Sequence, residues 1–199
     1  MAKTCVREIH LFDGDVFSQH NAFRAPGAPT IDELQAKPKK VAYLAAIYEK
    51  MRRGIHLHDH FVDGSTAEAL RGLDFVFLCL DSGATKKAIV MALMEFGIPF
   101  AEVGMGIVHS QNSLSGLMRV TVSTKEVQER VVKKMNFSDG DRAWDDYSTN
   151  IQIAELNAMN AALAVIRWKK QYGFYRDSSG AYSYSYSIAA NEMVNEDEA

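Results

Sequence analysis

Two aspartates and a glycine follow the first apolar segment of the chain, and these residue types suit a binding site. Asp13 and Asp15 flank Gly14 after "VREIHLF", and Asn21 and Arg24 come shortly afterwards. An acid at the end of a strand in a nucleotide-binding sheet commonly accepts hydrogen bonds from ribose hydroxyls. A guanidinium that follows it suits phosphate oxygens. The group therefore predicts one side of a nucleotide site.

Two lysines and a later aspartate extend this prediction. Lys39 and Lys40 begin a predicted helix, where backbone N–H groups and the helix dipole favour a bound anion. Asp81 ends the apolar run "DFVFLCL", and a carboxylate beside phosphates is the usual anchor for Mg²⁺. We expect this set to chelate ATP and Mg²⁺ rather than to perform acid–base chemistry.

Simpler roles exist for each of these residues. Asp13 and Asp15 are also the residues expected to cap a turn at Gly14. Asp81 suits the N-cap of the following helix, a role for which Ser82 competes. The asparagine and arginine are compatible with a solvated loop, and the two lysines with a charged helix start.

Three histidines and two cysteines have side chains that suit metal binding or nucleophilic chemistry. His56, His58 and His60 lie on one face of a predicted strand, as a transition-metal site requires, but no carboxylate or cysteine in the sequence completes the set. A polar strand face is the interpretation that the sequence favours. Cys79 lies in an apolar run, where cysteine behaves as a small hydrophobe, and Cys5 has no identifiable activating base.

Strands and helices alternate through residue 110, which predicts an α/β fold with a Rossmann-like, mostly parallel sheet flanked by helices. Antiparallel strands, a long alanine-rich helix and a tyrosine–serine hairpin follow. Ala154, Ala158 and Ala162 recur every four residues in that helix, which favours close packing. The predicted strands are 6–12, 55–62, 74–80, 98–107 and 117–124, and the predicted helices begin near 30, 39, 65, 84 and 151. Thr30 and Glu33 have the spacing of a capping box at the first of these helices, and Gly97 is expected to end the helix that begins near 84.

Composition excludes several classes of function. The net charge is -3 and the pI is near 6.1, so we expect no nucleic-acid partner. No apolar segment approaches membrane-spanning length, so we expect no membrane partner. Two cysteines outside any C-x-x-C pair exclude a disulfide scaffold and fit a cytoplasmic protein.

The joint pattern resembles a known family. "LFDGDVFSQHNAFR" is similar to the D-x-D...N-x-x-R signature of the ThiF/MoeB/HesA, ubiquitin-activating (E1-like) adenylating enzymes. The resemblance continues through "KPKK", "LCLDS" and "FGIPFAEVGMG", and the alanine-rich helix is similar to the family's C-terminal helix. It implies an adenylating domain over residues 1–172, followed by a hairpin and acidic tail over 173–199.

The resemblance also implies a reaction and roles for residues. The family transfers AMP from ATP to the C-terminal carboxylate of a ubiquitin-like or sulfur-carrier protein and releases pyrophosphate. Positioning and charge stabilisation supply the rate of such a step. By this resemblance Asp15, beside Asp13, binds the ribose, and Lys39 or Lys40 grips the phosphates. The implied catalytic residues are Asn21 and Arg24 at the phosphates and Asp81, which positions Mg²⁺.

The sequence departs from the family in three ways. No G-x-G-G-x-G turn precedes Val6, no C-x-x-C pair is present, and no cysteine follows Asp81. We therefore expect an N-terminally truncated chain, a fragment or half of a split enzyme, completed by an N-terminal companion segment or by homo-oligomer formation. Two alternatives are a non-catalytic scaffold that lost nucleotide binding and a dinucleotide-binding oxidoreductase. The spacing of Asn21 and Arg24 argues against the oxidoreductase.

Overall fold

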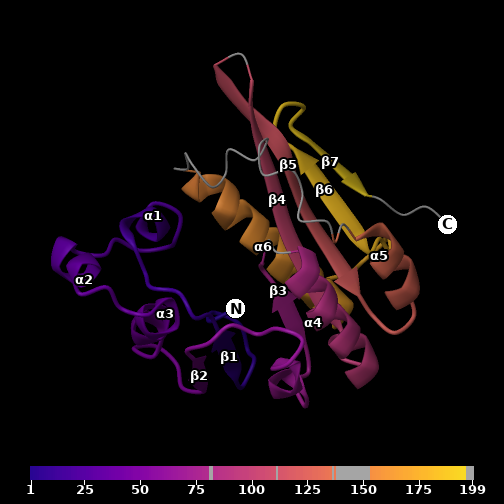
Figure 1. Cartoon of the computed structure of the whole chain (residues 1–199). Helices are drawn as coiled ribbons and strands as arrows, with labels where there is room; N and C mark the ends of the chain where they lie inside the picture. Colours follow the sequence, from indigo (N-terminus) through magenta and orange to yellow (C-terminus); the bar gives the residue numbers. More distant parts are fainter. Residues whose placement is uncertain (81–82, 111, 136, 138–152, 196–199) are drawn as a thin grey trace. The chain divides into compact units, whose positions relative to one another are not determined.

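Two units make up the chain in the computed structural model (Figure 1), which describes residues 1–80, 83–110, 112–135, 137 and 153–195. The first unit holds Met1–Val62 with Gln152–Ala154, and the second holds Asp63–Ile151 with Glu155–Ala199. Each unit has its own sheet. No helix among the described residues is long and apolar enough to cross a membrane.

The first unit is built on two parallel strands, β1 (Ile9–Phe12) and β2 (Ile55–His58). A parallel pair needs a crossover connection, and here three helices lie in that connection. They are α1 (Gln19–Ala22), α2 (Ile31–Gln35) and α3 (Lys40–Tyr48). Within this crossover, the residues that follow β1 lie beside the start of α3, where Val16 forms a β-bridge with Lys39.

A predicted capping box starts α2. The Thr30 hydroxyl accepts from the Glu33 backbone N–H at 3.2 Å, and the Glu33 carboxylate accepts from the Thr30 N–H at 2.7 Å. These bonds satisfy two N–H groups that a helix start leaves without partners. The sequence expectation for this helix is confirmed, and so is the expected helix start beside Lys39.

The second unit contains a five-stranded sheet in the order β3-β4-β5-β6-β7. Only β3 and β4 are parallel, and the other three pairs are antiparallel. The strands are β3 (Val76–Leu78), β4 (Phe100–Ser110), β5 (Ser113–Ser123), β6 (Ser183–Ser187) and β7 (Glu192–Asn195). The helices are a 3-10 turn (Ala67–Leu70), α4 (Gly83–Phe96), α5 (Gln128–Lys134) and α6 (Ala154–Gln171).

Helices cover both faces of this sheet (Figure 1). Lys86 of α4 binds Glu102 on one face of β4, and Arg167 of α6 lies over the ring of Tyr184 on the other face of the sheet. The core between these layers includes Leu93 and Phe100, which are completely buried. Burial of such apolar side chains is the main force that holds the layers together.

The chain is an α/β protein, as the alternating pattern predicts, but the expected mostly parallel sheet is corrected. The connection from Ser110 to Ser113 is too short for a crossover, so β5 must run antiparallel to β4. The hairpin of β6 and β7 then pairs with β5 and continues the same sheet. The predicted boundary at residue 172 stays a prediction.

Two burial expectations were wrong. The alanine stripe of α6, at Ala154, Ala158 and Ala162, is exposed, and the helix buries Asn160, Ala164 and Arg167 instead. Asn160 donates a hydrogen bond to the Gly104 carbonyl oxygen at 3.0 Å, so a polar residue anchors the buried face. Cys79 is exposed rather than buried in its apolar run.

Candidate functional site

The carboxyl end of β1 carries the two aspartates that the sequence selects, and the first of them shapes a turn. The Asp13 carboxylate accepts from the Asp15 backbone N–H at 2.7 Å, which is an Asx turn. A Cβ atom at Gly14 would lie 2.9 Å from the ring of Phe61, so a larger residue there would make this exposed side chain move. Asp13 therefore has the turn-capping role that the sequence suggests. Its bond to the Asp15 N–H fixes the backbone from which the Asp15 side chain extends.

Backbone hydrogen bonds hold this turn against the start of α3. The Lys40 N–H donates to the Asp15 carbonyl at 2.9 Å, and the Phe17 N–H donates to the Pro38 carbonyl at 2.7 Å. Phe17 is buried and its ring stacks on Tyr43 of α3 at 4.1 Å between centroids. The two ends of the site are thus fixed to each other by main-chain bonds and a packed aromatic pair.

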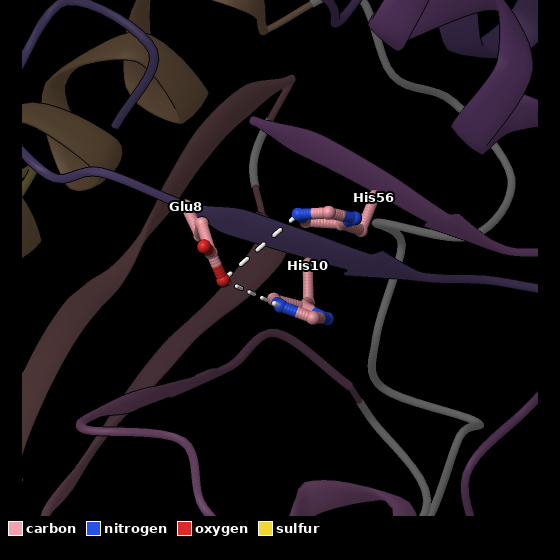
Figure 2. A group of neighbouring side chains, drawn as sticks. All are labelled: Glu8, His10 and His56. Carbon is pink, nitrogen blue, oxygen red and sulfur yellow. Dashed lines mark ion pairs between the residues drawn. The ribbon is translucent and has the colours of Figure 1, made fainter. Parts of the chain in front are cut away.

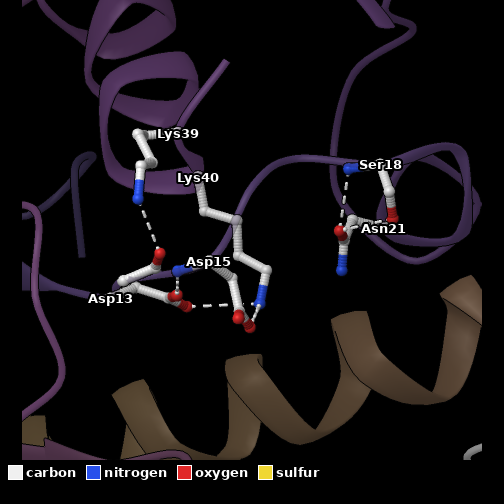
Figure 3. Close-up of polar contacts among 7 residues, drawn as sticks. Asp13, Asp15, Ser18, Asn21, Lys39 and Lys40 are labelled. Atoms are coloured by element: carbon white, nitrogen blue, oxygen red, sulfur yellow. Dashed lines mark hydrogen bonds and ion pairs between the residues drawn. The ribbon is translucent and has the colours of Figure 1, made fainter. Parts of the chain in front are cut away.

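Lys40 and the two aspartates form the charged centre of the site (Figure 3). The Lys40 Nζ lies 2.5 Å from the Asp15 carboxylate and 3.4 Å from the Asp13 carboxylate. The lysine side chain is mostly buried, whereas Asp15 is half exposed. A cation and two carboxylates at this strand end can contact both the phosphates and the hydroxyls of a nucleotide.

Lys39 points to different partners. Its Nζ donates to the Gly14 carbonyl at 2.8 Å and lies 3.0 Å from the Asp59 carboxylate. Lys39 is the N-cap residue of α3, whereas Lys40 is its first helical residue. The two adjacent lysines therefore leave the backbone in different directions, and only Lys40 pairs with Asp15.

Asn21 and Arg24 lie on the neighbouring turn around α1. The Asn21 Oδ1 accepts from the Ser18 N–H and from the Ser18 hydroxyl, both at 2.9 Å, and Figure 3 shows its amide nitrogen directed away from Ser18. The Arg24 N–H donates to the Asn21 carbonyl at 3.0 Å. Asn21 thus folds the turn that carries Arg24. Asp81 falls outside the described residues, so its predicted role in binding Mg²⁺ stays a prediction.

A second polar group occupies one face of the β1–β2 sheet. Of the three histidines considered from the sequence, His56 and His58 lie on β2 and His60 lies beyond its end. Burial lowers the pKa of His58, and the neighbouring His10, His60 and His56 lower it further. The sequence reading missed His10 and Glu8, which the strand pairing brings to the same face; the alternation of "VREIHLF" already placed these two residues on one side of their strand.

The second unit holds a buried charged group that sequence patterns did not single out. Glu102 is buried and lies 2.8 Å from Lys86 and 3.1 Å from Arg119. Glu102 and Arg119 line a small hollow together with Thr121, Val131, Met135, Tyr182 and Ser183. Two cations around one carboxylate give this hollow a polar interior.

Comparison with known proteins identifies the fold. No family model matches the chain, and no curated protein matches its sequence. The structure is similar to that of E. coli MccB solved with AMPCPP and MccA, with a TM-score of 0.70, 13% identity and coverage of 98% of this chain. It is also similar to that of PaaA, with a TM-score of 0.62, 17% identity and coverage of 94% of this chain.

These findings correct the family assignment made from the motif. Membership of the ThiF/MoeB/HesA family is overturned because no family model matches, and identities of 13% and 17% show a common fold alone. The chain spans 58% of the MccB chain and 55% of the PaaA chain. This chain therefore has the fold of part of these two proteins. It carries a charged group, Asp13, Asp15 and Lys40, at the end of β1.

Proposed function

We propose that this chain binds ATP at the end of β1 and transfers AMP to the C-terminal carboxylate of a polypeptide. The observation that carries the proposal is the convergence of Asp13, Asp15 and Lys40, with the Lys40 Nζ 2.5 Å from the Asp15 carboxylate. The similarity to MccB, solved with AMPCPP and MccA, supports the pairing of a nucleotide with a second molecule. A ubiquitin-like or sulfur-carrier protein is the acceptor that the motif suggests.

In the proposed reaction, a carboxylate oxygen of the acceptor attacks the α-phosphorus of ATP. The bond from that phosphorus to the bridging oxygen breaks, and pyrophosphate leaves with the electron pair. Asp15 accepts hydrogen bonds from the ribose hydroxyls, and Lys40 turns from Asp15 to the phosphates. Asn21 and Arg24 contact the phosphates from the adjacent turn. Mg²⁺, for which Asp81 is the proposed ligand, would neutralise phosphate charge.

The ion pair seen in the structure is compatible with this exchange of partners. Partly exposed ion pairs contribute only about 0.2–1 kcal/mol, so little stability is lost when Lys40 leaves Asp15. A triphosphate offers the lysine several charged oxygens at once and carries more negative charge than one carboxylate, so its Coulomb attraction for the ammonium group is larger. The balance favours the phosphate contact once the nucleotide is present.

ATP binding is the first test. Calorimetric titration of the full chain with Mg-ATP is expected to show one site, and Asp15→Asn is expected to weaken it. Asp32→Asn, an exposed acid on α2, is the matched control and should bind like the wild type. Absence of ATP binding in the wild-type chain would leave the scaffold interpretation in its place. Equal affinity in Asp15→Asn would show that the nucleotide binds elsewhere than at the end of β1.

Exchange of labelled pyrophosphate into ATP tests the transfer step. We expect exchange in the presence of a ubiquitin-like or sulfur-carrier protein with a free C-terminal carboxylate, and none when that carboxylate is amidated. Exchange that is independent of the acceptor's C-terminus would contradict the proposed reaction. ATP binding without exchange with any such acceptor would retain the nucleotide site and reject these carrier proteins as substrates.

A further inference from the structure

Three side chains on the two-stranded sheet have the composition of a transition-metal site. Figure 2 shows the rings of His10 and His56 directed toward the Glu8 carboxylate. We propose that Glu8, His10 and His56 bind one divalent first-row transition-metal ion of the Zn²⁺ type. This proposal is independent of the proposed nucleotide function.

The parallel pairing of β1 and β2 brings the three residues together. His10 lies opposite His56 in the register, and their rings stack with centroids 4.6 Å apart. Glu8 precedes His10 by two residues, and side chains two apart in extended chain point to the same face. The ligand set is therefore built from two segments in which His56 follows His10 by 46 positions in sequence, and main-chain pairing fixes them to each other.

The distances suit a metal after a small adjustment. The Glu8 Oε2 lies 3.9 Å from the His10 Nε2 and 4.0 Å from the His56 Nε2, and all three donor atoms lie within 4.8 Å of one another. Tetrahedral ligation with bonds of about 2.1 Å places donors roughly 3.4 Å apart, so each contact to Glu8 must shorten by about 0.5 Å. Because Glu8 is an exposed residue, side-chain rotation supplies this movement.

A fourth residue orients one of the ligands. The His10 Nδ1 lies 3.0 Å from the His58 Nε2, and His58 stacks on Phe12 with centroids 4.0 Å apart. In the tautomer in which the His10 Nδ1–H donates to His58, the His10 Nε2 lone pair faces Glu8. A metal-bound histidine almost always uses its second ring nitrogen in this way, which fixes the tautomer and the ring.

The donor types select the metal. Two imidazole nitrogens and one carboxylate suit Zn²⁺, Ni²⁺, Cu²⁺ or Fe²⁺ and are a poor set for Mg²⁺ or Ca²⁺, which prefer oxygen ligands. Three protein ligands leave at least one position for water. Within the described part of the chain, this is the one group of three histidine, cysteine or acidic side chains whose donor atoms converge to this degree.

Competitive titration of the full chain with Zn²⁺ tests the site. The parent for all measurements is the Cys5→Ser, Cys79→Ser double variant, because both cysteines are exposed and thiolates bind Zn²⁺. A chromophoric chelator reports the free metal, and Co²⁺ in place of Zn²⁺ reports ligand geometry through its visible spectrum. The variants are Glu8→Gln, His10→Gln and His56→Gln, with His20→Gln as the matched control. Circular dichroism verifies that each variant is folded.

We expect one equivalent of Zn²⁺ to bind the parent and no competition from Mg²⁺. Each ligand variant is expected to weaken Zn²⁺ at least tenfold, and His20→Gln is expected to bind like the parent. The proposal is overturned if the parent binds less than one equivalent, if all three folded ligand variants retain the parent's affinity, or if His20→Gln loses as much affinity as they do.

Discussion

The Nζ atom of Lys86 on α4 lies 2.8 Å from the Oε1 atom of Glu102 on β4, and the Glu102 side chain is almost completely buried. Arg119 on β5 approaches the same carboxylate at 3.1 Å. Burying a charge costs free energy unless the charge is paired. The two cations therefore offset the cost of burying the Glu102 carboxylate, and the carboxylate offsets that of Lys86. The group connects a helix and two strands of the second unit.

Removal of the Glu102 carboxylate should therefore destabilise the second unit strongly. Glu102→Ala leaves Lys86 and Arg119 without their counter-ion, and breaking a buried pair costs about 3–5 kcal/mol. Lys86→Met should cost less, because Arg119 still pairs with the carboxylate. Urea unfolding followed by circular dichroism measures both losses. Glu68→Ala, which breaks the exposed pair with Arg71, is the control and should change stability little.

The two lysines at the start of α3 should differ in their effect on ATP affinity. Lys40→Met removes the cation beside Asp15, and the loss of a charge-assisted bond to phosphate predicts a weakening of about 10- to 100-fold. Lys39→Met should weaken ATP less, because Lys39 is directed to the Gly14 carbonyl and Asp59. Calorimetric titration with Mg-ATP decides between them. A larger loss of ATP affinity in Lys39→Met would show that Lys39, rather than Lys40, contacts the phosphates.

The sequence was sufficient to predict local structure where one residue type dictates the backbone. The capping box of Thr30 and Glu33 and the glycine stop of α4 at Gly97, with φ of 68°, follow from rules that involve only a few neighbouring residues. The helix α5 was missed because its short segment, Gln128–Lys134, directly follows a strand pattern and lacks a side-chain cap.

The sequence alone could not predict which distant segments pair with each other. The alternation of the first segment placed Glu8 and His10 on one face, but the register that sets His10 opposite His56 depends on the whole crossover. The Lys40 contact to Asp15 likewise depends on main-chain bonds between the β1 turn and α3. The residue types of the proposed nucleotide site could thus be listed from the sequence, whereas the contact that distinguishes Lys40 from Lys39 is visible only in the structure.

Acid should remove a defined part of the stability through Asp177. Burial raises the pKa of this carboxyl, but the hydrogen bond and charge of Arg167 outweigh it, with help from Ser179 and Lys170, and lower the pKa from 3.8 to about 2. A depressed pKa stabilises the folded state above pH 4, and this contribution is lost as the pH falls through 2. The difference corresponds to about 2 kcal/mol.

Comparison of the wild type with Asp177→Asn isolates this effect. Free energies of unfolding in urea at several pH values between 2 and 6 should show a gap between the two proteins that is constant above pH 5 and shrinks by about 2 kcal/mol as the pH falls to 2. Other carboxyls cancel in the difference. A gap that does not change with pH would show that the Arg167 contact does not lower the pKa of Asp177 in solution.

The backbone at Gly54 should tolerate no side chain, because two separate effects oppose one. Its φ of +75° is strained for other residues, and a Cβ atom would lie 2.4 Å from the Arg7 carbonyl oxygen. Gly27 has a φ of +97° but open space around it, so it separates the two effects. Gly27→Ala should cost about 1 kcal/mol from φ alone, and Gly54→Ala more, since the β1 chain must move.

The Ile9 N–H donates to the Gly54 carbonyl at 2.8 Å, so that movement would also disturb the pairing of β1 with β2. We therefore expect Gly54→Ala to lower the midpoint of urea unfolding more than Gly27→Ala and to weaken Zn²⁺ binding, because His10 and His56 meet through that pairing. Equal midpoints for the two variants would show that the first unit relaxes around a methyl group at position 54.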